Sequence, residues 1–104
     1  PSVGYLLTRL HYNKAQYQRA IALFEAMPTH PFAPIEAERW RLLADSHWRL
    51  GKLEQSQAYF QKFADEFAPN SGERERGLDW VERVEWAINQ GIIPYPKASS
   101  GATE

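Results

Sequence analysis

The stretch that decides the fold is residues 36–69, which read EAERWRLLADSHWRLGKLEQSQAYFQKFADEFAP. In its first half, aromatic and apolar side chains recur at the i, i+3, i+4 and i+7 spacing that gathers them on one helical face. These residues are Trp40, Leu43, Ala44 and His47. Gly51 can adopt the left-handed conformation that ends a helix. The spacing resumes at Leu53 and stops at Pro69, because proline cannot continue a helix. The stretch therefore predicts two amphipathic helices joined by a tight glycine turn.

Helical spacing also runs through the sequence on both sides of this pair. It predicts a helix over residues 2–12, a second over residues 15–27 and a long last helix over residues 72–90. One face of the first helix is expected to carry the apolar residues and a histidine, namely Val3, Leu6, Leu7, Leu10 and His11. Ser71 is the expected N-cap of the last helix, and Gly91 is its expected left-handed stop.

Prolines mark the segments that are expected to lie outside helices. The run from Pro28 to Pro34 contains three prolines and predicts a stiff, extended connector. Pro34 can open the next helix, since its missing N–H falls among the first-turn donors that have no intrahelical partner. Residues 92–104 contain Pro94 and Pro96 and end in small, polar residues, so they are predicted to be a disordered tail.

The first predicted helix pair is repeated in the second. An offset of 36 residues aligns the two pairs without gaps. The matched positions are Leu7 with Leu43, His11 with His47, Ala15 with Gly51, Ala20 with Ser56 and Phe24 with Phe60. An offset of 40 residues places Trp80 on Trp40, and Gly91 on Gly51. Self-similarity at this period is typical of solenoids, in which each unit buries its apolar face against a neighbouring unit.

In these features the chain resembles the tetratricopeptide repeat family, whose unit is a helix-turn-helix with a Trp, Leu, Gly, Tyr, Ala, Phe, Pro signature. Trp40 and Leu43 match the start of that signature, and Ser56 and Phe60 keep its small-to-aromatic spacing. Ala44 stands where the signature has glycine.

The resemblance implies an all-α fold, a right-handed α-solenoid of antiparallel helix hairpins with about five helices. The domain would cover residues 1–91, with repeat one at 2–33, repeat two at 36–69 and a capping helix at 72–90. A five-helix array of another repeat type is the alternative fold.

Composition and charge disfavour two classes of partner. The chain has 104 residues and a net charge of −1 from 12 basic and 13 acidic residues, which argues against nucleic acid and anionic membranes as partners. No apolar run reaches the roughly 20 residues needed to cross a bilayer. There is no signal-peptide pattern, and the start at Pro1 suggests a segment of a longer protein. Cysteine is absent, so the redox compartment stays open, with the cytoplasm favoured slightly over the periplasm.

No catalytic or metal-binding pattern is found. His11 and His47 occupy matching places, but zinc needs three or four ligands and neither histidine has a cysteine or carboxylate at ligand spacing. Asp45, Ser46 and His47 are consecutive on a helix, so their side chains point in different directions and cannot form a catalytic triad. Phosphate-loop, HExxH and GxSxG motifs are absent. We therefore expect no enzyme activity, no cofactor and no metal.

The resemblance also implies a concave groove that could bind a partner. Carried over place by place, the groove face consists of Tyr5, Arg9, Tyr12, Asn13, Arg41, Asp45, Trp48, Arg49, Val81, Glu85 and Ile88. Arg9, Arg41 and Arg49 could clamp a carboxylate or phosphate while Tyr12 and Trp48 stack on the bound chain. Relatives that bind chaperone tails use a Lys and two Asn where this chain has Tyr5, Arg9 and Leu42, so that partner is not expected. The alternative is that the arginines are solvated or paired with Asp45 and Glu38.

Two functions follow as expectations. The first is a non-enzymatic adaptor that binds a peptide or partner protein in the groove, chiefly through Trp48, Arg41 and Arg49. The second is a structural module that forms homo-oligomers or stacks on further repeats, with any activity elsewhere in the parent chain. Two units and a cap are fewer than the three repeats usually needed for stability, which favours the second.

Overall fold

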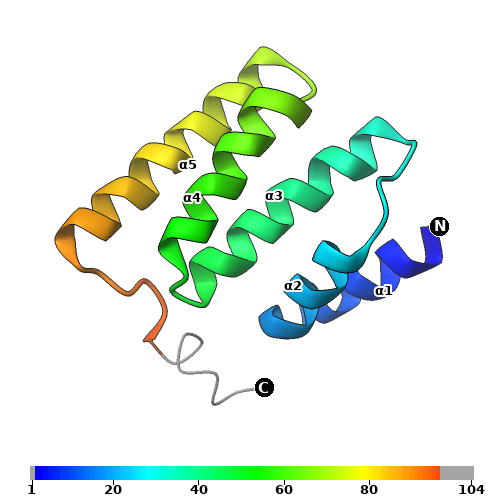
Figure 1. Cartoon of the computed structure of the whole chain (residues 1–104), viewed down its shortest axis with the longest axis horizontal. Helices are drawn as coiled ribbons and strands as arrows, with labels where there is room; N and C mark the ends of the chain where they lie inside the picture. The colour runs from blue at the N-terminus through cyan, green and yellow to red at the C-terminus, as the bar shows by residue number, and fades with distance from the viewer. Residues whose placement is uncertain (1, 97–104) are drawn as a thin grey trace.

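Helices make up most of the chain in the computed structural model, which describes residues 2–96 (Figure 1). The α-helices are α1 (Ser2–Asn13), α2 (Tyr17–Ala26), α3 (Ala33–Arg49), α4 (Leu53–Lys62) and α5 (Ser71–Gln90). A short π-helix, η1 (Phe63–Phe67), continues α4. The described residues contain no strand, so the predicted all-α class with five helices is confirmed.

Each helix packs against the next one along the chain, and the five lie side by side from α1 to α5 (Figure 1). Contacts also join every second helix. Arg9 of α1 pairs with Glu38 of α3, and Trp48 of α3 meets Trp80 of α5. On α4, the Tyr59 hydroxyl donates to Glu25 of α2. The central helix α3 therefore contacts elements on both sides of it.

The turns after α1 and α3 have the same backbone geometry at the predicted offset of 36 residues. The N–H of Gln16 donates to the carbonyl of His11 at 2.9 Å, and the N–H of Lys52 donates to the carbonyl of His47 at 2.9 Å. Ala15 has φ 60° and Gly51 has φ 75°, so both take the left-handed conformation. The sequence match between an alanine and a glycine thus corresponds to one shared turn.

Two apolar clusters form the core, and α3 contributes to both. The first lies among α1, α2 and α3 and comprises Tyr5, Tyr17, Ala20, Ile21, Phe24, Leu42, Leu43 and Leu50. The second lies among α3, α4 and α5 and comprises Ala44, Trp48, Leu53, Phe60, Val84 and Ala87. Phe60 is buried as expected, and Trp40 is partly buried with its ring stacked on Phe67 at 5.3 Å between centroids.

The last turn of the α4 segment widens into a π-helix, which the sequence pattern did not predict. The N–H of Ala68 reaches back to the carbonyl of Phe63 at 2.8 Å, the i→i+5 bond of a π-turn. This segment packs against α5 at Gly77. A Cβ at that position would lie 3.0 Å from the Phe63 ring and 3.1 Å from the Cβ of Ala64. Glycine therefore allows the close approach of the two elements.

The predicted C-terminal stop of α5 is confirmed, but its predicted N-cap is wrong. Gly91 is left-handed, with φ 67°, and the N–H of Ile92 bonds to the carbonyl of Ala87, as predicted for the helix stop. The N-cap is Asn70 rather than Ser71, because the Asn70 side chain accepts the N–H of Glu73. Residues 92–95 lie outside the helices, and residues 97–104 of the predicted disordered tail lie outside the described residues.

The apolar face of α1 does not lie in the core, contrary to the helical spacing. Val3, Leu6, Leu7 and Leu10 are exposed, whereas Tyr5 and Thr8 are buried. The reason is that, within residues 2–96, helices pack on one side of α1 only, and Tyr5 and Thr8 occupy that side. The leucines consequently face solvent.

Candidate functional site

Three of the predicted groove residues form one hydrogen-bonded cluster between α1 and α3. The Tyr12 hydroxyl donates to Oδ2 of Asp45 at 2.6 Å, and Nε of Arg49 donates to the same oxygen at 2.9 Å. Burial, together with the Asp45 carboxylate, raises the pKa of Tyr12. Burial alone would lower the pKa of Arg49. The Asp45 carboxylate opposes this shift, and the pKa of Arg49 is raised overall. The three groups satisfy one another, and the Arg49 guanidinium also lies over the Tyr95 ring at 5.1 Å.

Two other predicted groove residues lie in the core. Trp48 is 9% exposed and meets Trp80 edge-on at 5.4 Å between ring centroids, so it offers little surface to a ligand. Tyr5 is 3% exposed. Burial and the neighbouring Glu38 carboxylate raise the pKa of Tyr5. Its hydroxyl nevertheless has no partner with hydrogen-bonding geometry among residues 2–96.

Two further predicted groove residues, Arg9 and Arg41, share a single carboxylate. Nη1 of Arg9 lies 2.9 Å from Oε1 of Glu38, and Nη2 of Arg41 lies 3.8 Å from the same oxygen. Both arginine side chains are 47% exposed. One carboxylate between two guanidinium groups leaves an excess positive charge on this part of the surface. Of the two arginines, Arg41 is held more loosely, because its contact with Glu38 is longer.

Arg41 stands where two hollows meet between α3, η1 and the start of α5. One has a volume of ≈ 390 Å³ and extends toward Arg9 and Asn70. The other has a volume of ≈ 320 Å³ and extends toward Arg76 and Trp80. We call their combined space the Arg41 hollow; Arg41, Phe63 and Glu73 line both parts. Its lining holds the guanidinium groups of Arg9, Arg41 and Arg76, the carboxylates of Glu38 and Glu73, and apolar walls. The three cations outnumber the two anions, which suits a carboxylate carried beside an apolar side chain.

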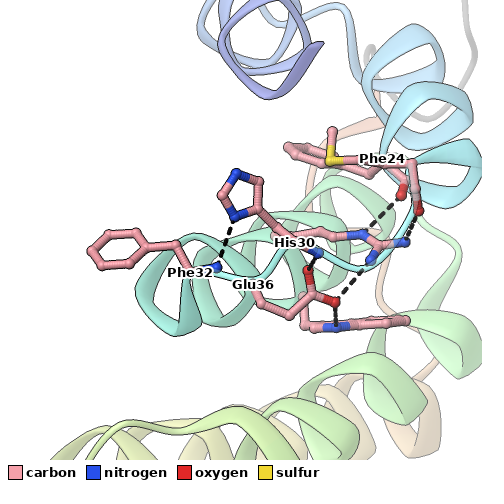
Figure 2. A network of polar contacts seen from close by, with 7 residues as sticks. Phe24, His30, Phe32 and Glu36 are labelled. Carbon is pink, nitrogen blue, oxygen red and sulfur yellow. Dashed lines mark hydrogen bonds and ion pairs between the residues drawn. The ribbon is translucent and has the colours of Figure 1, made fainter. Parts of the chain in front are cut away.

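A second polar network lies at the corner between α2 and α3 (Figure 2). Nη1 of Arg39 donates to Oε1 of Glu36 at 2.8 Å, and both side chains are nearly buried, at 6% and 5% exposure. Arg39 also donates to the carbonyls of Phe24 at 3.0 Å and Met27 at 2.7 Å. The network therefore ties the end of α2 and the proline-rich connector to α3.

Glu36 completes this corner. Its Oε2 accepts the N–H of His30 at 3.0 Å, and its Oε1 accepts Nε1–H of Trp40 at 3.0 Å (Figure 2). Nδ1 of His30 accepts the N–H of Phe32, while its Nε2 is buried and has no partner among residues 2–96. Sequence reasoning missed this structural role. The available signal was that Glu36 lies four residues before Trp40, and Arg39 four residues before Leu43, on the predicted apolar face.

The three consecutive residues considered as a catalytic triad, Asp45, Ser46 and His47, each hydrogen-bond to different partners. Ser46 donates to the carbonyl of Leu42 at 2.7 Å, and Nδ1 of His47 bonds to the carbonyl of Leu43 at 2.9 Å. Asp45 is occupied by Tyr12 and Arg49. The three consecutive side chains therefore form no hydrogen-bonded triad, as their helical spacing predicted. Burial lowers the pKa of His47, although its bond to the Leu43 carbonyl opposes that shift.

Within residues 2–96, no three His, Cys, Asp or Glu side chains are grouped closely enough to hold a metal ion. The same part of the chain has no helix that is both long and apolar enough to span a bilayer. Comparison with known proteins found no match to this chain among protein-family models, curated proteins or solved structures.

Proposed function

We propose that this chain is a non-enzymatic protein-interaction module of the tetratricopeptide type, a right-handed solenoid of two helix hairpins and a capping helix. Support comes from the repeated turn geometry at Ala15 and Gly51 and from the contacts between every second helix. Such arrays present one face made by their first helices to a partner. Here that face belongs to α1, α3 and α5.

The Arg41 hollow is the part of this face that suits a ligand best. Trp48 is buried and Arg49 is hydrogen-bonded to Asp45, so neither side chain is readily available to contact a ligand. Arg41 is half exposed, shares its carboxylate with Arg9, and borders apolar walls from Phe63 and Trp80. We infer that the ligand is a peptide segment that places an acidic side chain or a terminal carboxylate against Arg41. The half-paired state of Arg41 is the single observation that carries this proposal.

Selection of random peptides displayed on phage against the immobilised chain tests the proposal. Peptides recovered on the wild type should carry a carboxylate next to an apolar residue. Their affinity should fall roughly 10- to 100-fold in Arg41→Ala, since a hydrogen bond to a charged group contributes about 1.5–3 kcal/mol. Arg19→Ala is the matched control, because Arg19 is an exposed arginine on α2 that does not line the hollow. Equal affinity for both variants would argue against recognition at Arg41.

Self-association is the second candidate function, and one observation favours it. The exposed leucine face of α1 is too apolar to be explained by scattered surface residues.

A further inference from the structure

α1 carries a continuous apolar ridge on its solvent side. Val3 is 78% exposed, Leu6 62%, Leu7 51% and Leu10 47%. We call these four residues the α1 ridge. Their i, i+3, i+4 and i+7 spacing is that of a helix face that packs against another helix. Such a ridge exposes on the order of a few hundred Å² of contiguous apolar surface, the size of the largest apolar patch on a typical soluble monomer, and such patches are often functional.

A hollow lies directly beside the ridge. It has a volume of ≈ 360 Å³ and is lined by residues of α1, the end of α2 and the connector, including Gly4, Leu23, Ala26, Met27 and His30. Gly4 faces open space, because a Cβ there would meet no atom within 4 Å. Leu23 adds a further exposed apolar side chain, and the buried Nε2 of His30 lacks a partner among residues 2–96. These features describe a surface that another molecule completes.

α5, at the opposite end of the helix array, has a polar rather than an apolar outer surface. The outward side of α5 is mainly charged and polar, with exposed residues Glu75, Asp79, Glu82, Arg83, Glu85 and Asn89. Trp86, 58% exposed, is the large apolar side chain among them. If α1 of one copy packed on α5 of the next, these charges would be buried against leucines, which is costly. A head-to-tail chain of copies is therefore disfavoured.

We propose that a second copy of this chain covers the α1 ridge in a two-fold symmetric, head-to-head dimer. A two-fold interface uses the same patch on both copies, so the patch must complement itself. The α1 ridge meets that requirement, because its four exposed apolar side chains can pack against the same four side chains of a second copy. The buried area would be on the order of 1,000 Å² in total, at the lower limit for a specific complex, so the dimer should be weak. This dimer deepens the self-association function and does not depend on the Arg41 hollow.

Sedimentation equilibrium of the whole chain at several concentrations tests the dimer. The wild type should dimerise with a dissociation constant in the micromolar range, roughly 1–100 μM. Leu6→Glu should weaken dimerisation at least about tenfold, because each copy would bury a charge. Trp86→Glu should leave the dissociation constant unchanged, although Trp86 is as exposed as Leu6, at 58% against 62%. A monomer at all concentrations up to about 1 mM, or equal behaviour of the two variants, would overturn the proposal.

Crosslinking tests the head-to-head arrangement separately. The chain has no cysteine, so Leu6→Cys and Trp86→Cys each introduce a single thiol. Because Leu6 lies in the middle of the ridge, two copies of Leu6→Cys should form a disulfide-linked dimer under mild oxidation. Trp86→Cys alone, and an equimolar mixture of the two variants, should give no crosslink beyond the Leu6→Cys homodimer. Preferential crosslinking between Leu6→Cys and Trp86→Cys would instead identify a head-to-tail contact and reject the two-fold dimer.

Discussion

Replacing Arg39 with alanine should destabilise the whole fold. Arg39 supplies donors to the Glu36 carboxylate and to the carbonyls of Phe24 and Met27, at distances of 2.7–3.0 Å. Its removal leaves a buried carboxylate without its cation and two backbone acceptors without that donor. Breaking one partner of a buried ion pair costs about 3–5 kcal/mol, because the remaining charge stays desolvated. That is a large part of the roughly 5–15 kcal/mol that stabilises a typical small domain.

Urea unfolding followed by far-UV circular dichroism measures this cost. With an m-value of about 1–3 kcal/mol per M for a domain of this size, the midpoint for Arg39→Ala should fall by about 2 M. Arg76→Ala is a closely matched control. Arg76 also pairs with a glutamate three residues earlier at 2.8 Å, but its side chain is 76% exposed. Exposed pairs contribute about 0–1 kcal/mol, so this variant should unfold close to the wild type.

A double-mutant cycle sharpens the test. Glu36→Ala leaves Arg39 buried without its carboxylate, whereas the double variant removes both charges. The double variant should therefore lose less stability than the sum of the two single variants. Two results would contradict a stabilising role for the buried pair. One is that Arg39→Ala costs no more stability than Arg76→Ala, and the other is that the effects of Arg39→Ala and Glu36→Ala are additive.

Three further predictions concern Gly77, Gly91 and the buried His47. Gly77→Ala should lower the free energy of unfolding by about 1–3 kcal/mol, because its Cβ would press on Phe63 and Ala64; an unchanged urea midpoint would show that η1 yields easily. Gly91→Ala should cost about 1–2 kcal/mol, since φ is 67° there, and thermal unfolding of the variant checks it. Burial lowers the pKa of His47 in the folded state. Its contribution to the free energy of unfolding is therefore complete above pH about 6.5, the ordinary histidine pKa, and declines as the pH falls toward the lowered pKa. Urea unfolding at pH 7.5 and pH 5 should show a smaller loss of stability in His47→Gln than in the wild type, and equal losses would contradict this assignment.

Much of the fold could be predicted because its signals are local. Helical spacing, proline positions and the residues at the turns depend on neighbours within a few positions along the chain. Ala15 shows how far such reasoning extends. Its match to Gly51 places the two residues at the same point of the repeat, and both are left-handed. The helical spacing alone predicts a helix from Ala15, which is wrong, because α2 begins at Tyr17.

The positions of individual side chains were harder to predict, because they depend on which elements lie opposite. Leu6 and Leu43 both lie on the predicted apolar face of their helix, yet Leu6 is 62% exposed and Leu43 is fully buried. The reason is that no helix of residues 2–96 packs on the Leu6 side of α1. Arg39 is buried because carbonyls 12 and 15 residues earlier accept its hydrogen bonds, and no local pattern reveals those partners. Trp48 was expected on the binding face, but Trp80 covers it.

Recognition of a carboxylate at Arg41 is tested most directly by titrating ¹⁵N-labelled protein with a peptide recovered from the phage selection. The largest chemical-shift changes should fall on the residues that line the Arg41 hollow, including the Nε–H resonance of Arg41, and Arg41→Ala should remove them. Changes centred on the α1 ridge, or shifts that persist in Arg41→Ala, would contradict binding at this site.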